Sequence, residues 1–319
     1  MQRCVELAAS ASGHAAPNPM VGAVVVCDER IIGEGFHRQC GEAHAEANAI
    51  NSVRQTALLE RSTLYVNLEP CSHHGRTPPC ADLIIAARIP HVVVGSFDPN
   101  PLVAGKGIAC LRAAGCRVTE HVLEEECDRL NIRFMTFHRK RRPYVVLKWA
   151  QTADGFIDAA RDRNAIGRPV WITGWREQAL VHKWRSEEQA VLVGANTALA
   201  DNPLLNLRHW RGRQPLRATL DRRLRLPDSL HLFDQTLPTL VFTEKRLPDA
   251  KNLHYATIDF NEQLPQCILD ELRRRNVISV LIEGGAQLLQ TFIDAGLWDE
   301  ARVFTGKAVF GDGLRAPML

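Results

Sequence analysis

Two consecutive α/β domains are the fold that this sequence predicts. The chain has 319 residues, which is about twice the length of an ordinary single core. Along both halves, short apolar runs typical of strands alternate with helical patterns, and this alternation favours sheets layered with helices. A basic run at residues 138–143 ends in a proline and interrupts all periodicity. We therefore expect one domain at 1–138 and a second at 143–319.

The first half predicts five strands and five helices. Apolar runs indicate strands at 21–27, 31–36, 63–68, 91–95 and 117–122. Helical patterns lie near 2–11, 44–55, 80–87, 105–114 and 124–137. Asp28-Glu29-Arg30 separates the first two strands with turn-forming residues and predicts a hairpin.

The second half restarts after Pro143 with a different succession of elements. Apolar runs indicate strands at 144–150, 190–194, 217–220, 239–243 and 277–282. One helix is expected at about 176–186, and another follows Gly284-Gly285 through residue 295. The chain shows no internal repeat, so we expect two different domains rather than a duplication.

Composition and charge indicate a globular enzyme that acts on small molecules. Hydrophobic residues make up 45 % and charged residues 24 %, and a net charge of +3 gives little attraction for nucleic acid. The basic run at 138–143 is better explained as a solvated linker than as a phosphate contact. Nine scattered cysteines, with no signal peptide and no apolar run long enough for a membrane span, predict a cytoplasmic protein. The assembly state stays open, a homo-oligomer included.

One imidazole and two thiols in the first half form a pattern suited to zinc. His44-Ala45-Glu46 opens a helical pattern, and Cys71 and Cys80 follow about thirty residues later. Catalytic zinc takes three nitrogen or sulfur ligands, leaves a fourth position for water, and lowers the pKa of that water toward ~7. Glu46 points elsewhere than His44 on a helix, so its carboxyl group is the candidate proton shuttle of a hydrolytic deaminase.

Each of these residues also has a plainer explanation. A single histidine is usually a surface or core side chain, and two cysteines are usually buried thiols; only the joint pattern favours a metal. A closed structural zinc site would need a fourth ligand, for which His73 or His74 is available. Glu46 argues against that alternative.

The residues around this pattern resemble a known family. His44-Ala45-Glu46 together with Pro70-Cys71-Ser72-His73-His74-Gly75-Arg76-Thr77-Pro78-Pro79-Cys80 resembles the pyrimidine deaminase domain of the bifunctional riboflavin-biosynthesis deaminase/reductases. Related deaminases space the two cysteines as Cys-x-x-Cys, whereas eight residues separate them here. The segments at 17–22 and 98–101 match the same family, so the resemblance covers most of residues 1–140.

The resemblance implies a cytidine-deaminase-like mixed sheet and a diaminopyrimidinone substrate that bears a phosphoribosylamino group. This substrate would lose its ring amine and become the corresponding uracil. The residues that would hold it are Asn18, His37, His73, Arg76, Asp98 and Asn100. An asparagine suits a ring edge, and arginine or histidine can neutralise a phosphate. The plainer explanation is that the two asparagines, which lie beside prolines, form turns and that Asp98 caps a helix.

The second half contains a weaker signal for a phosphate-bearing cofactor. Gly284-Gly285 joins an apolar strand to a helix, and such a junction admits a phosphate close to backbone N–H groups. A Gly-x-Gly-x-x-Gly fingerprint is absent from the sequence, so a simple strand-to-helix turn is the plainer explanation for this motif alone.

Four further segments of this half, at 147–155, 171–174, 193–197 and 201–208, resemble in order the reductase domain of the same family. The resemblance implies a dihydrofolate-reductase-like α/β fold and hydride transfer from NADPH to C1′ of the opened ribose, leaving a ribityl chain. The residues that would line the NADPH site are Thr152, Thr173, Thr197, Asp201, Gly285, Ala286, Gln287 and Leu288. Those that would face the substrate are Lys148, Trp171, Arg185, Arg208 and Glu283.

Several alternatives stay open at this point. Reductases of this fold usually continue for a few dozen residues beyond the position of Leu319. The second domain is therefore expected either to be truncated or to end its sheet early, and a deaminase with an inactive second half is one alternative. A zinc-stabilised binding protein and a deaminase of nucleic-acid bases are the others. The reductase-like half and the near-neutral charge disfavour the last.

Overall fold

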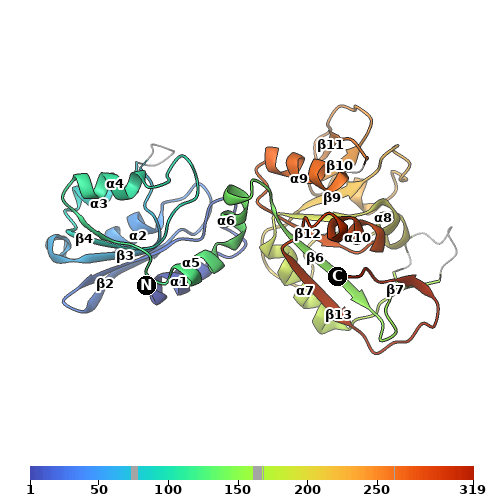
Figure 1. The fold of residues 1–319 in the computed structure, drawn as a ribbon, viewed down its shortest axis with the longest axis horizontal. Helices are drawn as coiled ribbons and strands as arrows, with labels where there is room; N and C mark the ends of the chain where they lie inside the picture. The colour runs from blue at the N-terminus through green and yellow to red at the C-terminus, as the bar shows by residue number, and fades with distance from the viewer. Residues whose placement is uncertain (73–77, 161–166, 168, 262) are drawn as a thin grey trace. The chain divides into compact units, whose positions relative to one another are not determined.

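The chain divides between Arg141 and Arg142 into two units, each with its own sheet and core. The structure is a computed structural model that describes residues 1–72, 78–160, 167, 169–261 and 263–319 (Figure 1). Within these ranges, no helix is both long and apolar enough to span a bilayer.

The first unit is built around a mixed five-stranded sheet. Its strands are β1 (Gly22–Cys27), β2 (Arg30–Phe36), β3 (Thr63–Leu68), β4 (His91–Ser96) and β5 (Arg117–Thr119). Its helices are α1 (Gln2–Ala9), α2 (Ala45–Asn51), η1 (Thr56–Arg61), α3 (Cys80–Ala86), α4 (Lys106–Ala113), α5 (Glu124–Leu130) and α6 (Ile132–Arg139). The strand order is β2-β1-β3-β4-β5, with antiparallel pairs around β1 and parallel pairs from β3 to β5. The predicted mixed sheet layered with helices is confirmed.

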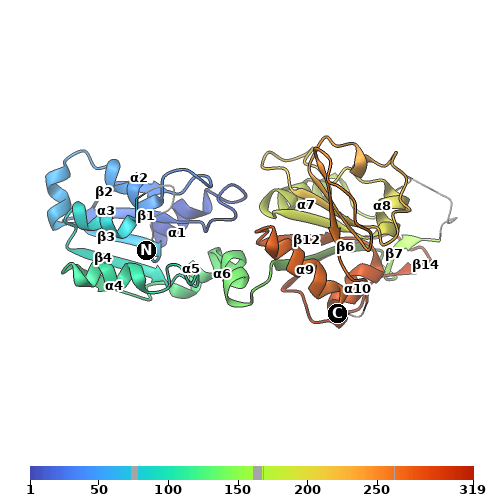
Figure 2. The ribbon, with the colours of Figure 1, turned by 90° about the horizontal axis from the view of Figure 1, so that it is seen from above.

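Helices cover both faces of this sheet (Figures 1 and 2). Apolar side chains of α2, α3 and α4, such as Ile50, Ile84 and Leu111, pack with strand residues into one core. Helices α1 and α5 lie on the other face. The carboxyl ends of the parallel strands β3 and β4 lead into loops that carry polar residues.

Strands β1 and β2 form the predicted hairpin. Asp28 and Glu29 have φ of 50° and 60°, so both central residues adopt left-handed backbone. Two such residues define the type I′ turn, whose twist matches that of the flanking strands. Aspartate tolerates this conformation better than most residues do.

Two glycines in β2 allow α2 to approach the sheet closely. A Cβ on Gly33 would lie 2.5 Å from the Ala49 carbonyl oxygen, and one on Gly35 would lie 2.4 Å from the Ala49 nitrogen. Real Cβ atoms do not approach backbone this closely, so a larger residue at either position would push α2 outward. The two glycines thereby fix the depth at which α2 lies, and His44 directly precedes α2.

Three elements of the first unit differ from the prediction by three residues or more, or in their number. The helix expected to continue to residue 55 ends at Asn51, where the Ser52 hydroxyl donates to the Ala49 carbonyl and accepts from the Glu34 N–H. The strand expected at 117–122 stops at Thr119. The helix expected at 124–137 is two helices separated at Asn131.

The second unit is built around a parallel seven-stranded sheet in the order β11-β10-β9-β8-β12-β6-β13. These strands are β6 (Tyr144–Gln151), β8 (Ala190–Val193), β9 (Leu216–Leu220), β10 (Thr239–Thr243), β11 (Leu253–Thr257), β12 (Ser279–Glu283) and β13 (Glu300–Thr305). A separate antiparallel pair is formed by β7 (Phe156–Ala159) and β14 (Gly313–Arg315). The helices are α7 (Trp175–Glu187), α8 (Ala195–Asp201), η2 (His231–Phe233), α9 (Leu264–Arg274) and α10 (Ala286–Asp294).

The centre of this sheet places two charged residues side by side on one face. Helices α9 and α10 pack on one side of the sheet and α7 lies on the other (Figure 2). Neighbouring residues of a strand point to opposite faces, so Leu147 and Ile282 enter the core beneath α9 and α10. Lys148 and Glu283 are paired across β6 and β12 and project toward α7 instead.

Candidate functional site

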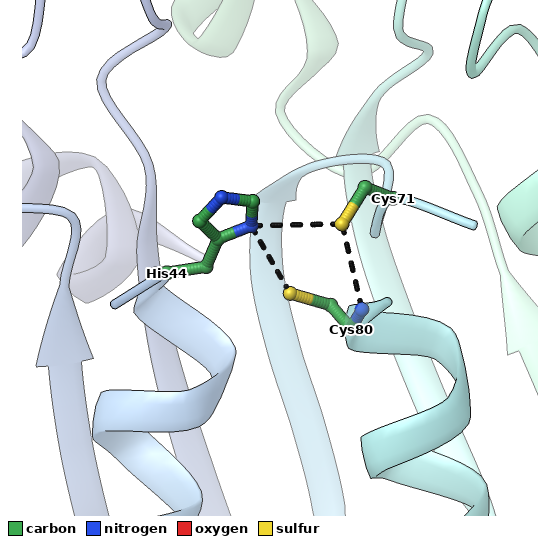
Figure 3. A group of neighbouring side chains, drawn as sticks. All are labelled: His44, Cys71 and Cys80. Atoms are coloured by element: carbon green, nitrogen blue, oxygen red, sulfur yellow. Dashed lines mark hydrogen bonds between the residues drawn. The ribbon is translucent and has the colours of Figure 1, made fainter. Parts of the chain in front are cut away.

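Three predicted metal ligands converge in the first unit (Figure 3). His44 directly precedes α2, Cys71 follows β3, and Cys80 begins α3. The His44 Nδ1 atom lies 3.5 Å from Cys71 Sγ and 3.3 Å from Cys80 Sγ. The ligand atoms of all three residues lie within 4.8 Å of one another, although the first and the last are 36 positions apart in the sequence. One ion can therefore contact all three.

The chemistry of this donor set fits zinc. One imidazole nitrogen and two thiolate sulfurs match the three-ligand sets of catalytic zinc sites. The contact with the Cys80 thiol, together with the contact with His44, outweighs the effect of burial and lowers the pKa of the Cys71 thiol. The contact with Cys71 raises the pKa of the Cys80 thiol. The two thiols together therefore lose one proton readily and keep the other. A bound divalent cation favours the thiolate form of both.

Glu46 lies in the first turn of α2 and is almost completely buried, at 3 % exposure. Burial, followed by the charge of Cys71, raises the pKa of its carboxyl group. Glu46 lines the same cavity as His44 and Cys71 without belonging to the group of three converging ligands. This position suits a group that exchanges protons beside a metal rather than one that binds the metal.

A cavity of about 370 Å³ opens beside the candidate metal ligands. It brings together most of the residues that the sequence predicted for the deaminase: Asn18, His37, His44, Glu46, Cys71, Asp98 and Asn100. Apolar side chains of Val21, Leu68 and Phe134 line it as well. His73 and Arg76, together with the alternative ligand His74, lie outside the described residues.

Asn18 and His37 form a hydrogen-bonded pair in the cavity wall. The His37 Nδ1 atom is 3.1 Å from the Ala43 carbonyl oxygen, which can only accept, so Nδ1 carries the proton. Nε2 then accepts from Asn18 Nδ2 at 3.1 Å. Burial lowers the pKa of His37, so the ring is neutral near pH 7. His37 therefore fits a hydrogen-bonding role better than the neutralisation of a phosphate.

Asp98 and Asn100 combine cavity-lining positions with turn formation. Asp98 Oδ1 accepts from the Asn100 N–H at 2.8 Å, and Asn100 Oδ1 accepts from the Leu102 N–H at 3.1 Å. The turn-forming role considered for Asn100 is therefore present, whereas Asp98 forms a turn rather than the helix cap considered for it, because Gly105 is the residue that precedes α4. Burial raises the pKa of the Asp98 carboxyl group to about 7.

Sequence reasoning missed three buried polar residues that shape this cavity. Asn67 and Asn131 both hold the backbone of Met20, which follows Asn18 and Pro19: Asn131 Oδ1 accepts from the Met20 N–H, and both side-chain amides donate to its carbonyl oxygen. Glu69 accepts hydrogen bonds from the loop that carries Asp98. The position of Glu69 between a strand and Pro70-Cys71 was the available signal for this residue.

In the second unit, three of the residues predicted to face the substrate form a charged cluster. Arg185 of α7 donates from Nε and Nη2 to both oxygens of Glu283, at 2.5 and 2.9 Å. Lys148 Nζ lies 4.0 Å from the same carboxylate. Burial alone would raise the pKa of Glu283, but Arg185 and then Lys148 outweigh it and lower the pKa to about 2. Burial lowers the pKa of Lys148, with the charge of Arg185 acting in the same direction.

A histidine that was not predicted from the sequence connects Arg208 to α7, the helix that carries Arg185. The Arg208 backbone N–H donates to His182 Nδ1 at 3.3 Å, and Arg208 Nη1 donates to Asn206 Oδ1. Arg185 contacts the same segment through the Asn206 carbonyl oxygen. Burial, then the charges of Arg185 and Arg208, lower the pKa of His182 to about 4, so its ring is neutral. Arg185, which binds Glu283, and Arg208 thus both contact Asn206.

The glycine junction has the open backbone that a phosphate-bearing cofactor requires. Gly284 and Gly285 have φ of 66° and 72°, which side chains rarely adopt. A Cβ on Gly285 would lie 3.0 Å from Thr197 Oγ1, so a side chain would fill this space. The helix α10 begins directly after the junction, and its first residues are the predicted Ala286, Gln287 and Leu288. Asp201 ends α8, the helix that also carries Thr197.

The remaining predicted cofactor and substrate residues have varied surroundings. Thr152 is fully buried, and its hydroxyl donates to Asp154 and accepts from the Phe156 N–H, so it holds the turn before β7. Thr173 is half-buried, whereas Trp171 is 63 % exposed.

Family models match both units. The cytidine and deoxycytidylate deaminase zinc-binding region matches residues 1–96, and the RibD C-terminal domain matches residues 143–319. The first match contains His44, Glu46, Cys71 and Cys80. The second contains the charged cluster and the glycine junction.

Full-length relatives extend this agreement. The riboflavin biosynthesis protein RibD of Synechocystis is 43 % identical, over 99 % of this chain and 86 % of that relative. A solved structure of the diaminohydroxyphosphoribosylaminopyrimidine deaminase/5-amino-6-(5-phosphoribosylamino)uracil reductase from Thermotoga maritima is 43 % identical, with a TM-score of 0.88. The match covers 99 % of this chain and 88 % of that one. Acinetobacter baumannii RibD is 36 % identical with a TM-score of 0.87 and the same coverage. With both units and their order matched over nearly its whole length, the chain belongs to the RibD family of riboflavin biosynthesis proteins.

Proposed function

We propose that this chain is a bifunctional enzyme of riboflavin biosynthesis. The first unit hydrolyses the ring amine of 2,5-diamino-6-(5-phosphoribosylamino)pyrimidin-4-one to give the uracil and ammonia. The second unit uses NADPH to reduce the ribosyl group of that product to ribityl. The observation that carries the proposal is the convergence of His44, Cys71 and Cys80 beside Glu46, in a cavity large enough for a pyrimidine ring.

The residues of the first unit divide the deamination among them. His44, Cys71 and Cys80 hold zinc, which when bound supplies an activated water at neutral pH. Glu46 would hold a proton at its carboxyl group beside the cavity and pass it to the departing amine. Asn18 and His37 present hydrogen-bonding groups to the ring edge, and Asp98 and Asn100, which line the same cavity, hold the ring as well. His73 and Arg76 complete the substrate contacts that we assign.

The residues of the second unit bind the phosphorylated product and exclude water from the reacting carbon. NADPH supplies the hydride when bound. Arg185 and Arg208 contribute positive charge for the phosphate, and Glu283 keeps Arg185 in a fixed orientation. Lys148 and Trp171 complete the substrate side. On the cofactor side we assign Thr152, Thr173, Thr197, Asp201, Gly285, Ala286, Gln287 and Leu288.

We further assign residues 1–138 to the deaminase domain and 143–319 to the reductase domain, and we place the enzyme in the cytoplasm. All nine cysteines are free of disulfides, as in a reducing compartment. The net charge of +3 supports a small-molecule substrate without nucleic-acid binding.

Two coupled assays test this function. Ammonia release is measured on the free diaminopyrimidine phosphate and on cytosine- or adenine-containing oligonucleotides, and NADPH oxidation is then measured on the product. Turnover of the free pyrimidine alone, followed by NADPH oxidation, is the expected result. Turnover of oligonucleotides would favour a nucleic-acid deaminase. Stoichiometric zinc without any ammonia release would favour a zinc-stabilised binding protein, and ammonia release without NADPH oxidation would indicate an inactive reductase.

A further inference from the structure

The buried carboxylate of Glu69 connects the metal-binding segment of the first unit to the substrate loop. Glu69 directly follows β3 and precedes Pro70-Cys71, so it lies two residues before a proposed zinc ligand. Its exposure is 4 %, and it lines the cavity. A buried carboxylate is costly unless hydrogen bonds compensate for the lost water. The hydrogen bonds that compensate Glu69 show what it holds.

In the described part of the chain, the hydrogen-bond partners of this carboxylate are four backbone N–H groups. Oε2 accepts from Asp98 at 3.4 Å and from Gly105 at 3.0 Å. Oε1 accepts from Gly107 at 3.0 Å and from Ile108 at 3.3 Å. Gly107 and Ile108 belong to the first turn of α4, whose N–H groups have no acceptor within the helix itself, so the Glu69 carboxylate satisfies them.

A single oxygen atom therefore holds both ends of one loop. Asp98 opens the segment that carries Asn100, and Gly105 closes it before α4 begins. The turns within the segment are local, since Asp98 binds Asn100 and Asn100 binds Leu102. These local bonds set the shape of the loop but not its distance from the metal ligands. Glu69 supplies that second constraint.

The start of α4 also rests directly on the chain next to Glu69. A Cβ on Gly107 would lie 1.9 Å from the Pro70 carbonyl oxygen, so only glycine allows this contact. The carboxylate of Glu69 and the backbone of Pro70 thus support the loop and the helix from the segment that leads to Cys71.

From this geometry we propose that Glu69 is a positioning residue of the deaminase, an inference that rests on the proposed function. It fixes the distance between the 98–105 loop and the metal ligands, so that Asp98 and Asn100 hold the pyrimidine over the reacting centre. It acts through backbone groups and exchanges no proton with substrate.

The test is Glu69→Gln, which preserves size but replaces one acceptor oxygen with an amide donor that repels the N–H groups. We expect KM of the deamination to rise about tenfold to a hundredfold, because a shift of about 1 Å in a binding group has effects of this order. The fall in kcat is smaller, and zinc content and reductase activity are unchanged. Glu60→Gln, at an exposed carboxylate of the same unit paired with Arg88, is the matched control and retains wild-type kinetics.

A double-mutant cycle separates positioning from general stabilisation. If Glu69 acts through the loop, Glu69→Gln raises KM much less in an Asn100→Ala background than in the wild type. Additive effects of the two substitutions would overturn the inference, as would unchanged kinetics of Glu69→Gln.

A second variant decides the matter if Glu69→Gln loses its zinc. Gly105→Ala keeps the carboxylate but strains a residue with φ of 80° and loosens one end of the loop. A KM rise of several-fold with zinc retained supports the inference, and an unchanged KM overturns it. The wild-type enzyme in the same assay keeps the two claims apart. If it releases no ammonia, the proposed function fails and the inference with it; if it is active, the variants judge the inference alone.

Discussion

The charge of Glu46 is set by where α2 places it. The side chain has almost no contact with water, and burial raises the pKa of its carboxyl group. A carboxyl group whose pKa lies nearer to neutrality transfers protons in both directions more readily than an exposed one. Glu46 therefore combines access to the cavity with an affinity for protons suited to a shuttle.

The first prediction concerns Glu46→Gln. We expect kcat for ammonia release to fall about a hundredfold to ten-thousandfold, which is the usual contribution of a general acid or base. Zinc content, measured by metal analysis, and NADPH oxidation by the second unit are unchanged, because the amide replaces a group outside the metal-ligand set. Retention of wild-type ammonia release would exclude Glu46 as the proton shuttle.

The second prediction concerns the buried pair of Arg185 and Glu283. Removing one partner leaves the other charged and buried, so Glu283→Gln should destabilise the second unit by about 3–5 kcal/mol. All six tryptophans lie at or beyond residue 149, so urea unfolding followed by tryptophan fluorescence reports on this unit alone. Glu244→Gln, which removes an exposed partner of Arg222, should leave the unfolding midpoint unchanged.

The same pair predicts a pH dependence of stability. The pKa of Glu283 in the folded chain, about 2, lies below its ordinary value of 4.5. A depressed carboxyl pKa stabilises the fold above the unfolded value, and this contribution disappears as the pH falls from 4.5 toward 2. The difference in unfolding free energy between wild type and Glu283→Gln should therefore shrink across that interval. A difference that stays constant with pH would contradict the assignment.

At the scale of elements, contacts between helices and strands determine where the metal ligands lie. Strand β2 has glycine at two positions that face α2, and this allows the helix to lie close to the sheet. Because His44 directly precedes that helix, the packing of α2 on the sheet helps to set the position of the His44 ring. The geometry of the candidate metal ligands thus depends on Gly33 and Gly35, which lie outside that group of ligands.

The third prediction follows from this packing. Gly35→Ala places a methyl group against α2 and should cost about 1–3 kcal/mol of stability in the first unit. Displacement of His44 should weaken zinc binding about tenfold to a hundredfold, as measured by competition with a chelator. Gly115→Ala is the control, because its side chain meets nothing within 4 Å, although its φ of 86° also strains the backbone. Equal zinc affinity in both variants would contradict this role for β2.

The elements best predicted from the sequence are those whose own residues determine them. The apolar runs of β1, β3 and β10 and the turn at Asp28-Glu29 can be predicted from the local sequence, without knowledge of any contact with a distant residue. The break at Asn131 could not be predicted, because its side chain binds the backbone of Met20, 111 residues away. Strand β13 was missed because its residues alternate with charged ones at the edge of the sheet.

The candidate site shows the same division. Residue type and spacing predicted that His44, Cys71, Cys80 and Glu46 belong to one site, because metal chemistry restricts which side chains can bind the ion or exchange protons beside it. Glu69 could not be assigned a role in this way, since its partners are backbone N–H groups whose identity the sequence does not encode.

At the scale of the whole molecule, the two units have separate cores and separate functional residues. Each core consists of side chains from its own sheet and helices. We therefore expect the chemistry of the second unit to be independent of an ion held by the first.

The fourth prediction is that chelation of zinc abolishes ammonia release and leaves the second unit intact. The unfolding midpoint from tryptophan fluorescence and the rate of NADPH oxidation on supplied product should both stay at the values of the untreated enzyme. Added zinc should restore deamination. A shift of the tryptophan transition on chelation would show that the metal also stabilises residues beyond the first unit.

The hydrogen bonds of Asn67 and Asn131 to the backbone of Met20 have a consequence for the order in which parts of the first unit form during synthesis. Translation releases the chain from its amino end, and domains begin to fold as they emerge from the ribosome. His44, Cys71 and Cys80 all emerge before Asn131, which completes the hold on Met20 behind Asn18 and Pro19. The emerging chain thus carries all three candidate metal ligands before the last anchor of one cavity wall has left the ribosome.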